Sequence, residues 1–232
     1  MRTIRFAALV AALVAVSSTR AAAQGGLPIN LQIGLPQGEF KENVSVAGGF
    51  GFAGIFPIAT EFGIRAGLDV QIYGNETRRV PLGGGALGLI NVDVTTTNAI
   101  VGGSIGAQVG LPSDRVKPYV GGMIGFSNFN TQSRVAGENS QDQPFASSTN
   151  SSDNAFSKHA LVGMYFPMSN GKVLVDLGAR YTWNGESVRY LTPGDITEDN
   201  DNNVVITPRE TRADLLTITL GVTIRFGGGQ AR

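Results

Sequence analysis

The chain has 232 residues, with 18 basic and 18 acidic side chains, and a formal net charge of zero at neutral pH. This balance excludes the basic footprint on which nucleic-acid binding depends, so we expect no nucleic-acid partner. The absence of cysteine excludes disulfides and a lipid-modified cysteine. After the first segment, no stretch has the roughly 20 consecutive apolar residues of a transmembrane helix.

The first segment has the pattern of a secretory signal peptide. Two arginines precede an apolar run that ends near residue 16, and three alanines offer a cleavage site before Gln24. We therefore predict a signal peptide over residues 1–23 and one mature domain over residues 24–232, which loses three arginines with the leader and becomes slightly acidic.

The mature domain has eight segments with the two-residue alternation or the glycine-rich pattern expected of strands. Their predicted bounds are residues 28–35, 44–56, 60–74, 87–110, 117–134, 155–167, 172–189 and 204–226. Short connections alternate with long polar ones, as periplasmic turns and extracellular loops alternate in outer-membrane barrels. The sequence therefore predicts an all-β fold, an eight-stranded antiparallel up-and-down transmembrane β-barrel after a cleaved signal peptide.

The last predicted strand has the clearest alternation. Its apolar positions are Leu216, Ile218, Leu220, Val222, Ile224 and Phe226. Successive side chains of a strand point to opposite faces, so these residues form one apolar stripe, while threonines and an arginine share the other face. The stripe indicates contact with lipid.

Glycine and aromatic residues fit the same interpretation. The 32 glycines include many inside predicted strands, where small residues on one face, such as Gly102, Ser104 and Gly106, indicate a narrow lumen. Aromatic residues near the strand ends predict two interfacial girdles. One set is Phe56, Phe62, Tyr119, Phe166 and Phe226 near the short turns, and the other is Tyr73, Phe126, Phe129, Tyr181 and Trp183 near the long loops.

Charged residues at alternate positions form the most specific internal pattern. The third predicted strand carries Glu61, Arg65 and Asp69 on its polar face, and the seventh carries Asp176 and Arg180. These strands lie opposite each other in an eight-stranded ring, so Arg65 comes about level with Asp176. The same count sets Asp69 level with Arg180. Because buried charges need partners, we predict a cross-lumen charge network that plugs the barrel.

Four parts of the chain resemble one family. They are Pro36-Gln37-Gly38-Glu39-Phe40, the segment 73–80, the segment 176–181 and the last strand ending on Phe226. Together they resemble small outer-membrane β-barrels of the group that contains the OmpA transmembrane domain, OmpX and the opacity proteins. The resemblance implies a location in the bacterial outer membrane, contact with its lipid, and insertion by the barrel-assembly machinery. That machinery would read Leu220, Val222, Ile224 and Phe226, here as an internal signal because six residues follow Phe226.

The sequence offers little catalytic or metal chemistry. His159, the only histidine, is followed by Ala160 and Leu161, so the His-x-Ser pattern of lipid A deacylases is missing and no serine is placed to be activated by it. The acidic segment 195–203 could hold a cation but lacks the glycine of an EF-hand, so we interpret it as a solvated loop tip. We predict no enzymatic activity, no metal site and no cofactor.

These patterns favour a structural role, in envelope integrity or in surface interaction. We expect a mobile polar loop over residues 136–154 that presents a surface to an extracellular partner. One alternative is a narrow transport barrel of the OmpW kind for small apolar molecules. A second is a soluble periplasmic lipid-binding barrel, in which the charged residues would lie on an exposed face.

Overall fold

The computed structural model describes residues 25–59, 61–82, 90–111, 116–137, 144, 146–168, 171–198 and 204–226. The predicted signal peptide and residues 199–203 of the acidic segment lie outside these ranges. Within them, no helix is both long enough and apolar enough to cross a membrane.

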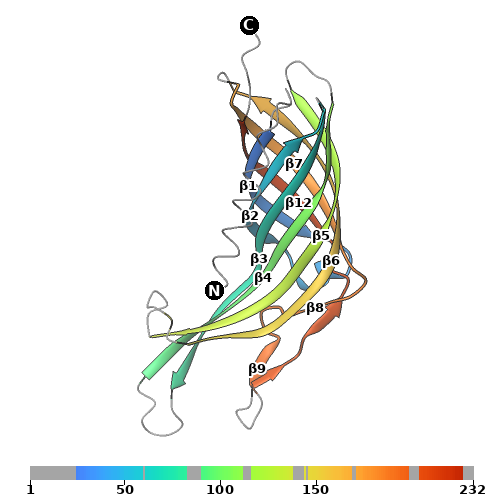
Figure 1. The fold of residues 1–232 in the computed structure, drawn as a ribbon. Coiled ribbons are helices and arrows are strands. Elements are labelled where there is room, and N and C mark those ends of the chain that lie inside the picture. The colour runs from blue at the N-terminus through green and yellow to red at the C-terminus, as the bar shows by residue number, and fades with distance from the viewer. Residues whose placement is uncertain are drawn as a thin grey trace, which may run out of the picture.

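Eight strands close into one antiparallel barrel, as the sequence predicts (Figure 1). They are β1 (Gly25–Pro36), β2 (Ala47–Pro57), β3 (Phe62–Leu82), β4 (Ile90–Gly110), β5 (Lys117–Ala136), β6 (Ala146–Pro167), β7 (Val173–Asn184) and β12 (Leu215–Phe226). The ring closes where β1 pairs with β12. The connections after β2, β4 and β6 define a short-turn end, and those after β1, β3, β5 and β7 define a long-loop end. The short helix α2 (Phe40–Asn43) lies at the long-loop end.

The barrel wall is apolar outside and polar inside. Leu31 of β1 pairs with Leu220 of β12, and both face outward with 71% and 56% of their surface exposed. The neighbouring polar side chains Asn30 and Gln32 are buried in the lumen. Burying polar groups and exposing leucine is unfavourable in water and favourable in lipid, so the wall is built for a membrane.

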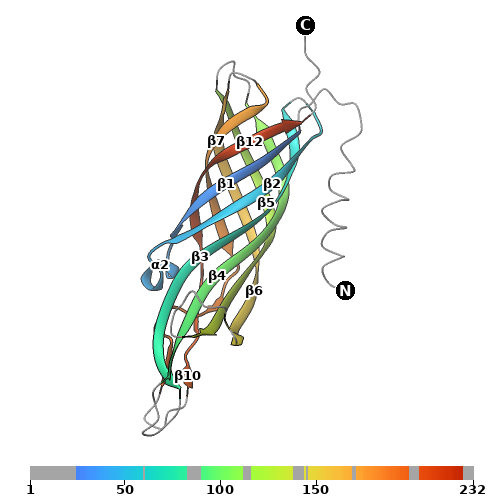
Figure 2. The same ribbon diagram turned by 90° about the vertical axis from the view of Figure 1, so that its left-hand side faces the viewer.

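At the long-loop end, four strands continue beyond the ring. β3, β4, β5 and β6 form a sheet extension in both views (Figures 1 and 2). The prediction of a mobile loop over residues 136–154 is therefore wrong from Ala146 onward. Asn128 donates to the Ser152 hydroxyl at 3.0 Å and Asn150 to the Ser133 hydroxyl at 2.6 Å. These cross-strand bonds stabilise a strand that composition alone does not favour.

The predicted strand over residues 204–226 is also interrupted. β10 (Val204–Ile206) pairs with β9 (Ile196–Glu198), and β11 (Arg209–Thr211) pairs with β8 (Val188–Tyr190), before β12 begins. Pro208 lies between β10 and β11 and lacks the N–H that a continuous ladder needs. Gly185 has φ +56° after β7, which ends the strand predicted to run to residue 189.

Three aromatic residues assigned to the girdles instead face the lumen. Tyr119, Tyr73 and Phe129 are buried inside the barrel, with 3%, 7% and 1% exposure. Each shares its strand parity with a polar lumen residue, such as Gln71 for Tyr73, and parity rather than nearness to a strand end decides the face. Outward exposure is found at Phe62, Phe126, Phe166, Trp183 and Phe226, while Phe56 and Tyr181 are half-buried.

Substitution of Leu220 tests the lipid-facing wall. Leu220→Arg should lower the free energy of unfolding by roughly 2–4 kcal/mol, because the residue faces outward near the middle of β12. Leu35→Arg is the matched control, since Leu35 faces outward beside Leu216 at the long-loop rim, where the cost falls to about 0–1 kcal/mol. Urea unfolding from lipid vesicles measures both. Equal losses would contradict a lipid-embedded band.

Candidate functional site in the barrel lumen

An ion pair spans the middle of the lumen. The Arg180 guanidinium of β7 lies 2.9 Å from the Asp69 carboxylate of β3, and both side chains are largely buried. β3 and β7 occupy opposite sides of the ring, so the contact crosses the barrel interior. Removing either partner of a charge-assisted bond between two desolvated groups leaves the other charge buried and unpaired, which destabilises the protein.

Arg65 and Asp176 are linked through intervening side chains. Arg65 donates to the Gln108 amide oxygen at 2.9 Å, and its guanidinium lies 6.0 Å from the centre of the Tyr119 ring. The Tyr119 hydroxyl donates to the Asp176 carboxylate at 2.8 Å. Arg65 thus interacts electrostatically with Asp176 across the tyrosine, without the direct ion pair that strand counting suggests.

The structure excludes Glu61 from this network. Glu61 precedes β3 and its side chain is exposed at the short-turn end. It borders a cavity of about 370 Å³ in the mouth of the barrel, with Gln108 and Tyr165 also in the lining. The alternation that places Arg65 and Asp69 inside does not extend to Glu61, because the chain is already turning toward β2 there.

A chain of amide side chains joins three strands across the lumen. Gln71 of β3 donates to Gln32 of β1 at 2.8 Å and to the Thr217 hydroxyl of β12 at 3.3 Å. Gln32 in turn donates to Asn30 at 2.8 Å. All four side chains are buried. Their hydrogen bonds to one another replace bonds to water for most of these polar atoms, although the Gln71 Oε1 atom has no partner among the described residues.

His159 has a serine partner that sequence reasoning missed. The Ser157 hydroxyl lies 3.0 Å from His159 Nε2, and His159 Nδ1 lies 3.0 Å from the Thr182 hydroxyl. The order along the strand is Ser-x-His, the reverse of the pattern sought. Thr182 stands where a hydrolytic triad has a carboxylate, and Ser157 is fully buried. This geometry joins β6 to β7 and offers no substrate access to the hydroxyl.

Apolar layers lie on both sides of the polar middle. Toward the short-turn end, the Tyr119 and Tyr165 rings stack with centroids 4.5 Å apart, among Met123, Leu161 and Leu174. Toward the long-loop end, Phe40 of α2 packs edge-on against Tyr190 at 5.0 Å, Tyr73 at 5.7 Å and Phe129 at 6.1 Å. The sequence signal for this second layer was the lumen parity of Tyr73 and Phe129.

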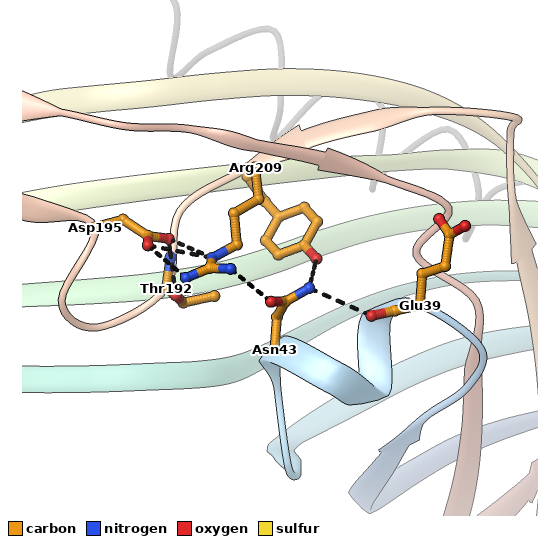
Figure 3. Close-up of polar contacts among 6 residues, drawn as sticks. Glu39, Asn43, Thr192, Asp195 and Arg209 are labelled. Atoms are coloured by element: carbon orange, nitrogen blue, oxygen red, sulfur yellow. Dashed lines mark hydrogen bonds and ion pairs between the residues drawn. The ribbon is translucent and has the colours of Figure 1, made fainter.

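Polar contacts hold α2 and the β7–β12 connection together above the lumen (Figure 3). Arg209 contacts both Asp195 carboxylate oxygens, its Nη2 lying 2.9 Å from Oδ1, and its Nη1 donates to the Asn43 amide oxygen at 2.7 Å. Asn43 donates to the Tyr190 hydroxyl at 3.1 Å and to the Glu39 carbonyl at 3.3 Å. We call these five residues, Glu39, Asn43, Tyr190, Asp195 and Arg209, the cap.

Asp195 is committed to the cap. Burial alone would raise the pKa of its carboxyl, but hydrogen bonds from Arg209 and from the Thr192 hydroxyl and backbone N–H hold that pKa below its ordinary value of 3.8. Asp195 is thus engaged by an arginine. Among the described residues no group of three acidic or histidine side chains could hold a metal ion. The remainder of the acidic segment, residues 199–203, lies outside the described residues.

Removal of one partner of the central ion pair should destabilise the barrel. We predict that Asp69→Ala lowers the free energy of unfolding by roughly 3–5 kcal/mol, because Arg180 is left buried without its counter-ion. Glu76→Ala breaks the exposed contact with Arg78 and should cost at most about 1 kcal/mol. Urea refolding in detergent micelles compares the two. Exchanging the charges, as Asp69→Arg with Arg180→Asp, should recover part of the loss.

The cap should loosen in acid. The folded-state pKa of Asp195 is depressed, so its contribution is complete above the ordinary carboxyl value and is lost as the pH falls through the lower folded value. The protection of the Thr192 amide, which donates to Asp195, against hydrogen exchange should fall over that acid range, when its rate is compared with that of an unstructured amide at the same pH. Asp195→Asn should abolish the pH step. An unchanged step in this variant would show that another group titrates.

The comparisons with known proteins agree with this architecture. The sequence profile of the outer membrane protein beta-barrel domain matches residues 6–226. No curated protein sequence matches the chain.

The chain is also similar to solved structures that share little sequence with it. Neisserial surface protein A is 13% identical, with 87% of this chain and 97% of that chain covered and a TM-score of 0.45. Ail of Yersinia pestis, solved with the heparin analogue sucrose octasulfate, is 13% identical, with 88% and 98% covered and a TM-score of 0.44. OprG of Pseudomonas aeruginosa is 13% identical, with 90% and 98% covered and a TM-score of 0.46.

The profile match spans nearly the whole chain, and the closed eight-stranded ring carries an apolar outer wall. The short-turn end of such a barrel faces the periplasm and the long-loop end faces outward. The chain belongs to the outer membrane protein beta-barrel domain family and is a protein of the bacterial outer membrane.

Proposed function

We propose that this protein is a sealed outer-membrane barrel with a structural role, which supports the envelope and presents a shaped surface outside the cell. The observation that carries the proposal is the filling of the lumen at three successive levels. A tyrosine layer lies toward the periplasm, a charged and amide layer lies in the middle, and an aromatic layer lies beneath the cap.

Energetics support a closed middle layer. An eight-stranded ring leaves an interior that side chains can fill, and here Asp69 and Arg180 meet across it. A continuous water path would have to separate this pair or displace the amide chain through Gln71. Both changes break bonds between groups that have few other partners nearby, so the filled arrangement is favoured.

The outer end supports a surface role. The sheet extension and the β7–β12 connection brace each other, since Arg78 donates to the Ile196 carbonyl at 3.0 Å and the Arg189 N–H donates to the Asp153 carboxylate at 2.7 Å. These contacts bring order to segments that would otherwise be separate loops. An extracellular partner would meet a preformed surface of low ordering cost.

The two alternatives fare differently. Membership of an outer-membrane family and the exposed apolar wall exclude the soluble periplasmic barrel. A transport barrel with a lateral opening would need a gap between strands, whereas β1 to β7 and β12 pair all the way round the ring. No contact in the described residues favours that function over a sealed one.

Insertion by the barrel-assembly machinery is part of the proposal. Val222, Ile224 and Phe226 face outward on the final strand, together with Leu220. Phe226 pairs with Gly25 at the periplasmic rim, so this stripe ends where the ring closes. An assembly machinery that binds the last strand before the others would contact these side chains on the face of the strand that later meets lipid.

Conductance in planar bilayers tests the sealed lumen. We predict no steady current through the wild-type barrel, and intermittent openings in a variant with both Asp69→Ala and Arg180→Ala, which removes the central contact without leaving either of its charges unpaired. Glu42→Ala, an exposed change on α2, is the control and should behave as wild type.

One pattern of results would replace this proposal with the transport function. It is a steady wild-type current, together with altered ion selectivity and unchanged stability in the Asp69 and Arg180 variants. In that case the ion pair would line a pore instead of filling it.

A further inference from the structure

The outward face of the barrel carries one charged side chain between its two rims in the described residues. That residue is Lys158 of β6, and its neighbours on the same face are apolar. It lies directly across from Ile124 of β5 and from Trp183 of β7. A lysine among lipid-facing side chains is costly unless its ammonium group reaches a polar partner. No ion pair or hydrogen bond engages Lys158 in the described residues.

The depth of Lys158 places it at the outer edge of the apolar band. Phe166 of the periplasmic girdle lies eight positions farther along β6, which is roughly 20 Å along the membrane normal for a tilted strand. The apolar band of such barrels is about 25 Å tall. Phe156 and Phe126, an exposed cross-strand pair, lie two residues farther along their strands toward the long-loop end. Lys158 therefore lies where the headgroups of the outer leaflet begin.

A second cation borders the same patch from the other side. Trp183 packs against Tyr181 with ring centroids 4.6 Å apart, and the Tyr181 hydroxyl contacts the Asp214 carboxylate at 3.4 Å. Arg212 Nε lies 3.1 Å from that carboxylate, and its side chain is more than half exposed. Strand β7 lies between β6 and β12, so Lys158 and Arg212 flank the Tyr181–Trp183 pair.

We propose that this patch, formed by Lys158, Tyr181, Trp183, Arg212 and the Phe126–Phe156 pair, binds a phosphorylated glycolipid of the outer leaflet. Lys158 and the outer part of Arg212 contact headgroup phosphate. The aromatic rings contact the sugar region, and Ile124 and Val162 contact acyl chains. Asp214 holds Arg212 in place and offsets part of its charge, which leaves Lys158 as the principal phosphate contact. The proposal is independent of whether the lumen is sealed.

The single tryptophan of the chain supplies the test, because Trp183 is the cross-strand neighbour of Lys158. The protein is reconstituted into phosphatidylcholine vesicles that contain increasing fractions of lipid A with both phosphates. Trp183 emission should change and saturate. Lys158→Gln should need roughly fivefold more lipid A for half the change, as expected for the loss of one cation near the surface. Lys158→Arg should titrate as wild type.

Three controls separate this site from general attraction. Lys41→Gln removes an exposed charge on α2 and should leave the titration unchanged. Lipid A without phosphates, and phosphatidylglycerol at equal charge density, should give no saturable change. Circular dichroism verifies that each variant keeps its β-sheet. The proposal is overturned if Lys158→Gln titrates as wild type, or if either control lipid matches lipid A. In that case the Lys158 ammonium group reaches the polar headgroup level without binding a particular lipid.

Discussion

Closure of an eight-stranded ring in lipid is the constraint on which the rest of this structure depends. Lipid offers no hydrogen-bond partner to a free strand edge, and β1 and β12 accordingly pair from Gly25 with Phe226 to Pro36 with Leu215. The ring encloses a space that side chains alone can fill. Each polar side chain of the inward face must therefore find its partner within that space. The Asp69–Arg180 pair and the amide chain through Gln71 meet most of this requirement, and the Gln71 Oε1 and Arg180 Nε atoms are left without a partner in the part of the chain that the structure describes.

Glycines create the room that these contacts need. A Cβ on Gly102 would lie 3.0 Å from an Asp69 carboxylate oxygen, and one on Gly163 would collide with the Tyr119 phenol. Tyr119 can thus lie flat over its neighbours and reach Asp176. The outer layer is organised differently, since Phe40 comes from α2 rather than from the barrel wall. Stability in the middle of the barrel depends on lumen packing, whereas order at the outer end depends on the cap.

Alternation along the strands predicted most of the fold and part of the lumen. It placed Leu220 outside and Asp69 inside, and counting from the turns set Asp69 level with Arg180, where the structure joins them. It failed where tertiary contacts override local pattern. The extension of β6 depends on cross-strand hydrogen bonds between amide and hydroxyl groups. The inward aromatic residues lie near strand ends, which predicts a girdle position, but the alternation along their strands places them in the lumen. The contact of Ser157 with His159 follows from their shared face, a relation that a search for one fixed motif order cannot find.

Thiol labelling tests the filled lumen most directly, because the chain has no cysteine of its own. Ser157→Cys and Thr217→Cys place a thiol at fully buried lumen positions on β6 and β12, and Lys41→Cys places one on the exposed face of α2. A membrane-impermeant maleimide should label the Lys41 variant on intact cells and leave both lumen variants unlabelled until the barrel is denatured. Labelling of either lumen thiol in the folded barrel at the rate of the Lys41 variant would contradict the account.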